Sequence, residues 1–373
     1  MPLNVPGVYI KEDASLSLSV PSGATAVPVF VGSFTAIPDS ATRVDSWLSF
    51  TRLLGDAADE KSGGTSHLLG AVRGYFENGG GPCFIVSTTA EDLDGSLAAI
   101  DGEGTILVAP DLWSEGEEKA AAWARGLASH ASAHEQMAIL HTDRGQSAGE
   151  AIETVQGWGL GEEEAAFATV YFPWLQTSSD IGRALPPVGH VAGVWARTDR
   201  DRGVWKAPAN AALSGVTTLD QEITDDVHRE LNEVGINAIR SFPEQGQLVW
   251  GARTLAAAST DLRWRYIPVR RLFNAAHRDI RKALKFATFE SNTQPTWEKV
   301  RAAVDGYLHA LWRMGALQGA KPEEAYFVQI GLGVTMTQED IDQGKLVLKV
   351  GMAAVRPAEF IILEFTQDVI AGT

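Results

Sequence analysis

Between about residues 25 and 175, short apolar runs alternate with segments whose apolar residues recur every three or four positions. Uninterrupted apolar runs are typical of strands buried on both faces, and the longer repeat is typical of amphipathic helices. Strands separated by helices indicate a mostly parallel sheet covered on both sides. The predicted strands are residues 26–31, 84–87, 105–109, 137–140 and 168–172, and the predicted helices are residues 47–54, 68–76 and 120–133.

The pattern changes beyond about residue 235, where two strong helical repeats precede paired strands. Residues 297–311 carry an apolar helical face, and Thr296 is the expected N-cap. Residues 345–350 and 360–365 are the predicted strands. We therefore expect a domain boundary near residues 235–245.

The first 24 residues differ in pattern from the rest of the chain. Residues 7–12 alternate like a short strand, and residues 15–22 alternate Ser with Leu and Val without any charge. Such a segment buries little by itself. Two interpretations stay open here: a frayed terminus, or a strand that needs a partner.

Composition limits the function classes. The chain of 373 residues is 45% hydrophobic and 21% charged, which is typical of a globular protein of about two domains. Its net charge of -16 argues against a general nucleic-acid binder. No apolar run reaches the roughly 20 residues that cross a bilayer. The start lacks the pattern of a Sec-type signal, and Cys83 is the single cysteine, so we expect synthesis in the cytoplasm.

One predicted helix collects positive charge. On a helical wheel Arg271, Arg278, Lys282 and Lys285 fall on one side, opposite an apolar face. We call these four residues the basic ridge. It is either a solvated face balanced by nearby carboxylates or a docking surface for an acidic protein.

Candidate catalytic residues do not form a convincing set. Residues 64–66 (GTS) and 189–193 (GHVAG) are similar to the serine and histidine segments of subtilisin-type proteases. Here Ser66 precedes His190, the reverse of the usual order, and the aspartate segment is missing. We therefore expect no catalytic triad.

Nucleotide and metal motifs are equally weak. Residues 79–81 are three glycines, but Pro82 follows where a phosphate loop needs Lys and Ser or Thr. His130 and His134 are spaced to share a metal, yet only Glu135 lies beside them, which favours an ordinary surface helix. Cys83 is expected to be a buried, inert thiol. We expect no metal, no cofactor and no enzymatic activity.

A series of ordered motifs carries a family resemblance. The segments FPWL (172–175), PPVGHVAGVWARTD (186–199) and GVWKAPAN (203–210) resemble sheath proteins of contractile phage tails and related injection particles. The resemblance covers nearly the whole chain. Further matching segments are residues 6–10, 249–255, 269–272, 289–292, 315–319 and 356–360. Residues 12–15 and 24–30 look most similar to sheaths of extracellular contractile injection systems of the antifeeding-prophage and Photorhabdus virulence-cassette type.

The resemblance implies an α/β fold, α+β overall, in four parts. Residues 1–24 would be an N-terminal arm, and residues 25–240 an outer subtilisin-like domain without a triad, with a mostly parallel sheet. Residues 241–357 would be a mixed α/β inner domain, and residues 358–373 a C-terminal arm. The arms would add strands to sheets of neighbouring subunits. The expected arm-strand residues are Val8, Tyr9, Ile10, Lys11, Phe360, Ile361, Ile362, Leu363 and Phe365.

The same resemblance implies a structural function. Such subunits form helical stacks of hexameric rings around an inner tube and contract without nucleotide hydrolysis, driving the tube through a target membrane. The implied partners are further copies of the chain, the inner tube, baseplate and terminal cap proteins, with a second sheath paralogue as a further candidate. No nucleic acid and no direct membrane insertion are expected. The basic ridge would face the tube, and the particle would assemble in the bacterial cytoplasm before release. A phage tail sheath proper is the near alternative, and a hydrolase on a subtilisin-like scaffold is the distant one.

Overall fold

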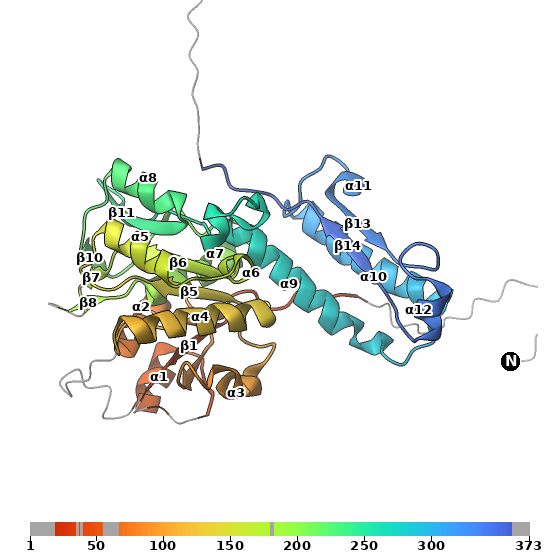
Figure 1. Ribbon diagram of the computed structural model, residues 1–373, viewed down its shortest axis with the longest axis horizontal. Coiled ribbons are helices and arrows are strands. Elements are labelled where there is room, and N and C mark those ends of the chain that lie inside the picture. Colours follow the sequence, from red (N-terminus) through yellow and green to blue (C-terminus); the bar gives the residue numbers. More distant parts are fainter. Residues whose placement is uncertain (1–18, 35–36, 38–39, 55–66, 180–182, 360–373) are drawn as a thin grey trace, which may run out of the picture. The chain divides into compact units, whose positions relative to one another are not determined.

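The computed structural model describes residues 19–34, 37, 40–54, 67–179 and 183–359 (Figure 1). The chain divides into two compact units. We call residues 22–278 together with 354–359 the α/β unit, and residues 279–353 together with 19–21 the C-terminal unit. The expected boundary after residue 240 lies within strand β11 (Ile236–Phe242), whereas the division falls inside helix α9 (Ile267–Leu284). A boundary at residue 240 would cut this strand, which is hydrogen-bonded to β6 (Ala168–Phe172) on one side and to β12 (Gly246–Val249) on the other.

A nine-stranded mixed sheet forms the centre of the α/β unit. Its order is β2-β3-β1-β4-β5-β6-β11-β12-β9, and the six strands from β3 to β11 are parallel. The parallel pairing of β1, β3, β4, β5 and β6 confirms the prediction from the apolar runs. The bounds are β1 Pro28–Gly32, β2 Thr42–Val44, β3 Cys83–Ser87, β4 Ile106–Val108, β5 Met137–His141, β6 Ala168–Phe172, β9 Ala211–Ala212 and β12 Gly246–Val249.

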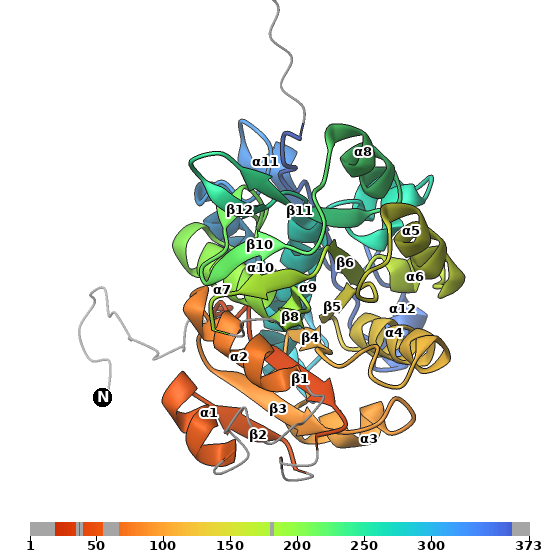
Figure 2. The ribbon, with the colours of Figure 1, turned by 90° about the vertical axis from the view of Figure 1, so that its left-hand side faces the viewer.

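Alternate side chains of each central strand enter two different apolar clusters. Val29 and Val31 of β1 belong to the cluster that contains residues of helices α3, α4, α5 and α8, whereas Phe30 between them belongs to the cluster that contains residues of α1, α2 and α7. Figure 2 shows α2 and α7 on one side of the sheet and α4 and α5 on the other. This three-layer arrangement explains why the strand sequences are apolar throughout. The helices are α1 Trp47–Leu54, α2 Leu68–Glu77, α3 Leu93–Leu97, α4 Glu117–Ala133, α5 Ala148–Gly157, α6 Glu162–Ala165, α7 Val188–Arg202 and α8 Asp225–Glu233.

Helices α2 and α7 pack with unusually close backbones. A Cβ atom added at Gly189 of α7 would lie 2.1 Å from the carbonyl oxygen of Ala71, and one at Gly193 would lie 2.4 Å from that of Tyr75. Both positions therefore require glycine. A three-stranded antiparallel sheet flanks this region, with β7 Leu175–Thr177 between β8 Ala184–Leu185 and β10 Val216–Leu219.

The C-terminal unit is built on helix α10 (Gln294–Arg313) and the antiparallel pair β13 (Tyr326–Gln329) and β14 (Lys349–Met352). Its apolar cluster centres on Val300, Ile330 and Met336. Tyr307 donates a buried hydrogen bond of 2.9 Å to Asp279. Two short helices, α11 Pro322–Ala325 and α12 Gln338–Asp342, complete the unit.

Two predicted details of this unit are wrong. The N-cap of α10 is Thr293 rather than Thr296, because Pro295 starts the helix earlier. The strand predicted at residues 345–350 begins only at Lys349, since the Lys345 N–H instead donates to the carbonyl of Asp340 within α12. The strand predicted at residues 360–365 lies outside the described residues.

Candidate functional site: two clamps at the chain ends

The N-terminal segment enters the α/β unit through a buried ion pair. Arg271 of α9 donates to both carboxylate oxygens of Asp199 of α7, at 2.9 and 2.6 Å, and to the carbonyl oxygen of Thr25 at 3.1 Å. Thr25 in turn donates its hydroxyl to Asp199 at 2.5 Å. The side chains of Arg271 and Asp199 are only 3% and 5% exposed. We call Thr25, Asp199 and Arg271 the N-terminal clamp.

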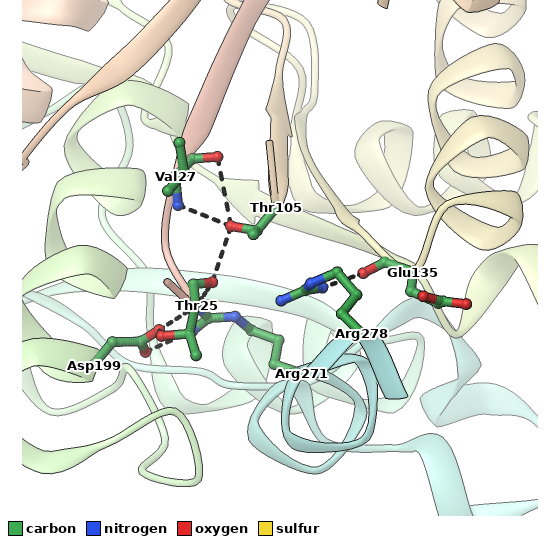
Figure 3. A network of polar contacts seen from close by, with 7 residues as sticks. All are labelled: Thr25, Val27, Thr105, Glu135, Asp199, Arg271 and Arg278. Carbon is green, nitrogen blue, oxygen red and sulfur yellow. Dashed lines mark hydrogen bonds and ion pairs between the residues drawn. The ribbon is translucent and has the colours of Figure 1, made fainter. Parts of the chain in front are cut away.

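A second contact fixes the same stretch of chain to the sheet. The hydroxyl of Thr105 donates to the Thr25 carbonyl at 2.9 Å and accepts the backbone N–H of Val27 at 2.8 Å. Figure 3 shows these bonds converging on residues 25–27, immediately before β1. The chain is therefore held by α7, by α9 and by the start of β4 at the point where it joins the sheet.

The polar face of α9 lies along the amino ends of the parallel strands. Arg271, Asn274 and Arg278 follow one another at helical spacing. Asn274 donates to the Gln136 carbonyl at 3.0 Å. Arg278 donates to the Glu135 carbonyl at 2.5 Å, just before β5, as Figure 3 shows. Arg271 also lies 4.5 Å from the ring of Trp195, which stabilises a guanidinium through a cation–π contact.

The C-terminal segment is held by a second arginine. The guanidinium of Arg253 donates from Nε to both oxygens of Glu359, at 3.0 and 3.2 Å, and from Nη2 to one of them. Its Nη1 donates to the Asn232 carbonyl at 2.7 Å, and the Tyr266 hydroxyl donates to Glu359 at 3.3 Å. We call Arg253, Tyr266 and Glu359 the C-terminal clamp. Burial, with the charge of Glu359 adding to it, raises the pKa of Tyr266, so the phenol stays protonated as a donor.

The backbone of Arg253 is itself fixed by β11. Asn237 accepts the Arg253 N–H at 2.7 Å and donates to its carbonyl at 2.8 Å, and Thr169 donates to the same carbonyl at 2.9 Å. A Cβ at Gly251 would lie 2.6 Å from Asn237 Oδ1, so glycine is needed for this approach. The clamp thus connects residue 359, the last described, to two central strands.

The structure distributes the basic ridge over different environments. Arg271 is buried in the N-terminal clamp and Arg278 is half-buried, whereas Lys282 and Lys285 are exposed. An exposed ridge of four residues is therefore not present. Lys285 lies beyond the end of α9, in the 3-10 turn Lys285–Ala287, and a buried carboxylate, Asp199, allows the polar face of α9 to turn inward at its start. The expected arm-strand residues, from Val8 to Lys11 and from Phe360 to Phe365, lie outside the described residues.

The protease-like and thiol candidates occupy the core. His190 is buried in α7 against Gly74, and burial lowers its pKa to about 4. Burial raises the pKa of the Cys83 thiol to about 12, which disfavours the reactive thiolate. Ser66 lies outside the described residues. None of the helices that the structure describes is long and apolar enough to cross a bilayer.

Sequence patterns do not reveal the clamp residues as a set. Arg253 and Glu359 are 106 positions apart, and Arg271 and Asp199 are 72 apart, so no local pattern joins them. All four nevertheless lie in or beside the matched segments 186–199, 249–255, 269–272 and 356–360. The signal that could have found them is the presence of a carboxylate at the end of one matched segment and an arginine in another, which suggests an ion pair between the two segments.

The fold and the two clamps define a class of protein: an α/β protein in which residues near both ends of the described chain, Thr25 and Glu359, are held to one central sheet by buried arginines. Two family models match the chain, the phage tail sheath protein central domain over residues 89–255 and the phage tail sheath C-terminal domain over residues 259–368. The chain belongs to the tail sheath family of contractile phage tails and contractile injection systems.

Solved structures and a curated relative agree with this family. The chain is 44% identical, with a TM-score of 0.81 and 98% of each chain covered, to one in the contracted sheath complex of the PVC extracellular contractile injection system. It is 46% identical, with a TM-score of 0.79, to one in the contracted helical sheath of the anti-feeding prophage, covering 98% of this chain and 99% of that one. The tail sheath protein of Vibrio phage KVP40 is 27% identical over 191 residues, 46% of this chain but only 28% of its own length.

Proposed function

We propose that the protein is the structural subunit of a contractile sheath, and that it has no enzymatic activity. The observation that carries this proposal is the similarity, over 98% of the chain, to subunits of sheaths solved in the contracted state. The particle type that this similarity favours is the extracellular contractile injection system. A phage tail sheath proper is the second candidate, favoured only by the shorter match to phage proteins.

Both chain ends serve as links between subunits in this proposal. Residues 1–24 and 358–373 would add strands to sheets of neighbouring copies, using main-chain hydrogen bonds. At a net of roughly 1 kcal/mol per bond, an arm making about five bonds contributes about 5 kcal/mol per junction. The clamps are placed where such an arm would pull. Each terminal segment would be anchored by an arginine–carboxylate pair. A pull on an arm would therefore act on α7, α9 and the central strands and would not detach the segment from the sheet.

Contraction needs no nucleotide in this account. The extended lattice would be kinetically trapped and the contracted lattice lower in free energy, so that a trigger at the baseplate starts the change. The arms keep the lattice connected while the globular contacts re-form. We infer that the α/β unit is the outer domain with a subtilisin-like topology, supported by its six parallel strands between two helical layers. The C-terminal unit would line the wall around the tube.

The remaining partners follow from the same proposal. Copies of the chain would form hexameric rings, assembled in the bacterial cytoplasm around an inner tube and bounded by baseplate and cap proteins. Of the basic ridge, the exposed Lys282 and Lys285 are the residues we assign to weak, salt-screened contact with the tube.

The test is co-expression with the inner tube and baseplate proteins of the same particle, followed by electron microscopy. Hollow cylinders that shorten on triggering are expected. Monomers that form no polymer with the tube present, and that label with a serine-directed fluorophosphonate, would favour the hydrolase instead.

Charge reversal tests the tube contact separately. Lys282→Glu with Lys285→Glu should weaken sheath–tube co-assembly and leave the folded monomer intact. Lys299→Glu with Lys321→Glu, which reverses two other exposed lysines of the C-terminal unit, is the control with the same change in charge. Equal co-assembly of both variants would remove the tube-facing assignment.

A further inference from the structure

Two histidines at the end of α4 meet two aspartates from an earlier part of the chain. His130 Nδ1 lies 2.5 Å from Asp94 Oδ1, and His134 Nδ1 lies 3.0 Å from Asp101 Oδ1. The two imidazole rings stack with centroids 4.2 Å apart and planes at 13°. Potential ligand atoms of Asp94, His130 and His134 all lie within 4.8 Å of one another. The sequence favoured an ordinary surface helix because both aspartates are more than thirty positions away.

The cluster has the chemistry of a cation site. Two imidazoles in contact repel each other when both are protonated, and neutral imidazole is the metal-binding form. The side chain of His130 is only 4% exposed, whereas that of Asp94 is 84% exposed. Mixed nitrogen and carboxylate ligands suit Zn²⁺ and its neighbours, whereas Ca²⁺ and Mg²⁺ prefer oxygen alone.

We propose that Asp94, His130 and His134 bind a divalent transition-metal cation of the Zn²⁺ type, with Asp101 orienting His134. Zinc–ligand bonds near 2.0 Å place tetrahedral ligand atoms roughly 3.3 Å apart. To admit the ion, the exposed carboxylate of Asp94 would move away from His130, and the two imidazoles would turn out of their stacked arrangement so that each directs a nitrogen at the ion. A hydrogen bond from His134 Nδ1–H to Asp101 leaves Nε2 free as the ligand. Water would complete the fourth position.

Such an ion would tie α3 to the end of α4 on the surface of the α/β unit. Asp94 and His130 are 36 positions apart, so the bond closes a long loop. Because the site forms only in the folded chain, bound metal stabilises the fold by mass action. This role is independent of the proposed arms and of contraction.

The test uses the full chain without a polyhistidine tag, stripped of metal and titrated with Zn²⁺ by calorimetry. One ion per chain and a rise in melting temperature are expected with Zn²⁺, with no comparable rise with Ca²⁺. Co²⁺ should give the visible absorption of a tetrahedral nitrogen–oxygen site. His134→Ala and Asp94→Asn should each weaken binding at least about tenfold, and Asp101→Asn, acting through His134, by about 10- to 100-fold.

The matched control is His309→Ala, a histidine of α10 in the C-terminal unit. It should bind Zn²⁺ as the unaltered chain does. Melting curves without metal show whether each variant folds. His134→Ala is the variant least expected to disturb folding, because His134 lies at the end of α4. Absence of Zn²⁺ binding, or equal binding by the His134→Ala and His309→Ala variants, would overturn the proposal.

Discussion

The N-terminal clamp gives the sharpest prediction for stability. Asp199→Asn keeps the size of the side chain but removes the charge that faces Arg271. Asp199 accepts three hydrogen bonds, two from Arg271 and one from Thr25, in a site where both charged side chains are at most 5% exposed. Removing one partner of a buried ion pair typically costs about 3–5 kcal/mol, because the other charge stays buried without compensation.

The assay is urea unfolding of the full-length monomer near neutral pH. We expect Asp199→Asn to lower the free energy of unfolding of the α/β unit by about 3 kcal/mol, the lower end of that range, since the Thr25 carbonyl still accepts from Arg271. The control is Asp226→Asn. Its carboxylate, 81% exposed, pairs with Arg229 at the surface, where loss of a pair costs at most about 1 kcal/mol.

A double variant separates folding from assembly. Arg271→Met with Asp199→Leu replaces the pair by apolar side chains and retains a contact with Trp195, so the unfolding free energy should return to within about 1 kcal/mol of the unaltered chain. The double variant still lacks the hydrogen bonds that Arg271 and Asp199 make with Thr25, so sheath assembly should remain impaired. An Asp199→Asn variant as stable as the Asp226→Asn control would refute the energetic reasoning. Normal cylinders from the double variant would refute the role of the clamp in assembly.

Three further predictions concern other parts of the α/β unit. Glu359→Gln should leave Arg253 of the C-terminal clamp without its charged partner and lower the free energy of unfolding by about 1.5–3 kcal/mol in the same urea assay. An unchanged midpoint would contradict a stabilising role for the C-terminal clamp. Gly189→Ala should destabilise the α/β unit by about 1–3 kcal/mol through the α2–α7 contact. The control, Gly306→Ala, lies at an exposed position of α10 in the C-terminal unit with open space around it, and it should stabilise that unit by about 0.5–1 kcal/mol. Equal effects would mean that the close approach is not needed. Burial lowers the pKa of His141 and His190 to about 4, so only the unfolded chain takes up their protons below about pH 6.5. The free energy of unfolding should therefore fall as the pH drops from 6.5 toward 4, by up to about 1.4 kcal/mol per pH unit for each histidine. His190→Gln should reduce that slope. An unchanged slope would show that His190 titrates alike in the folded and the unfolded chain.

Much of the α/β unit was predictable because its signals are local. Apolar runs such as residues 137–140 are typical of central strands buried on both faces, and glycines with positive φ, such as Gly79 at +97°, follow the ends of helices. The boundary near residue 240 was not predictable in this way. Strand β11 continues the parallel sheet although it follows a change in composition, and only its pairing with β6 reveals this.

The clamps could not be derived from local pattern. A helical wheel identifies one polar face of α9 but not which way that face points. Arginine is usually solvated, so an exposed ridge was the natural interpretation. Burial of Arg271 depends on a carboxylate 72 positions earlier and on the ring of Trp195, which tertiary packing alone brings together. The pairs formed by His130 and His134 with two distant aspartates were hidden for the same reason.

Cryo-electron microscopy of an assembled particle, at a resolution that traces the main chain, is the most direct test of the proposed sheath. In the reconstruction, residues 8–11 and 360–365 should be hydrogen-bonded to strands of adjacent copies, with Arg271 and Arg253 holding the roots of both segments. Termini that instead pair with their own chain, in a particle that is nevertheless intact, would contradict the account.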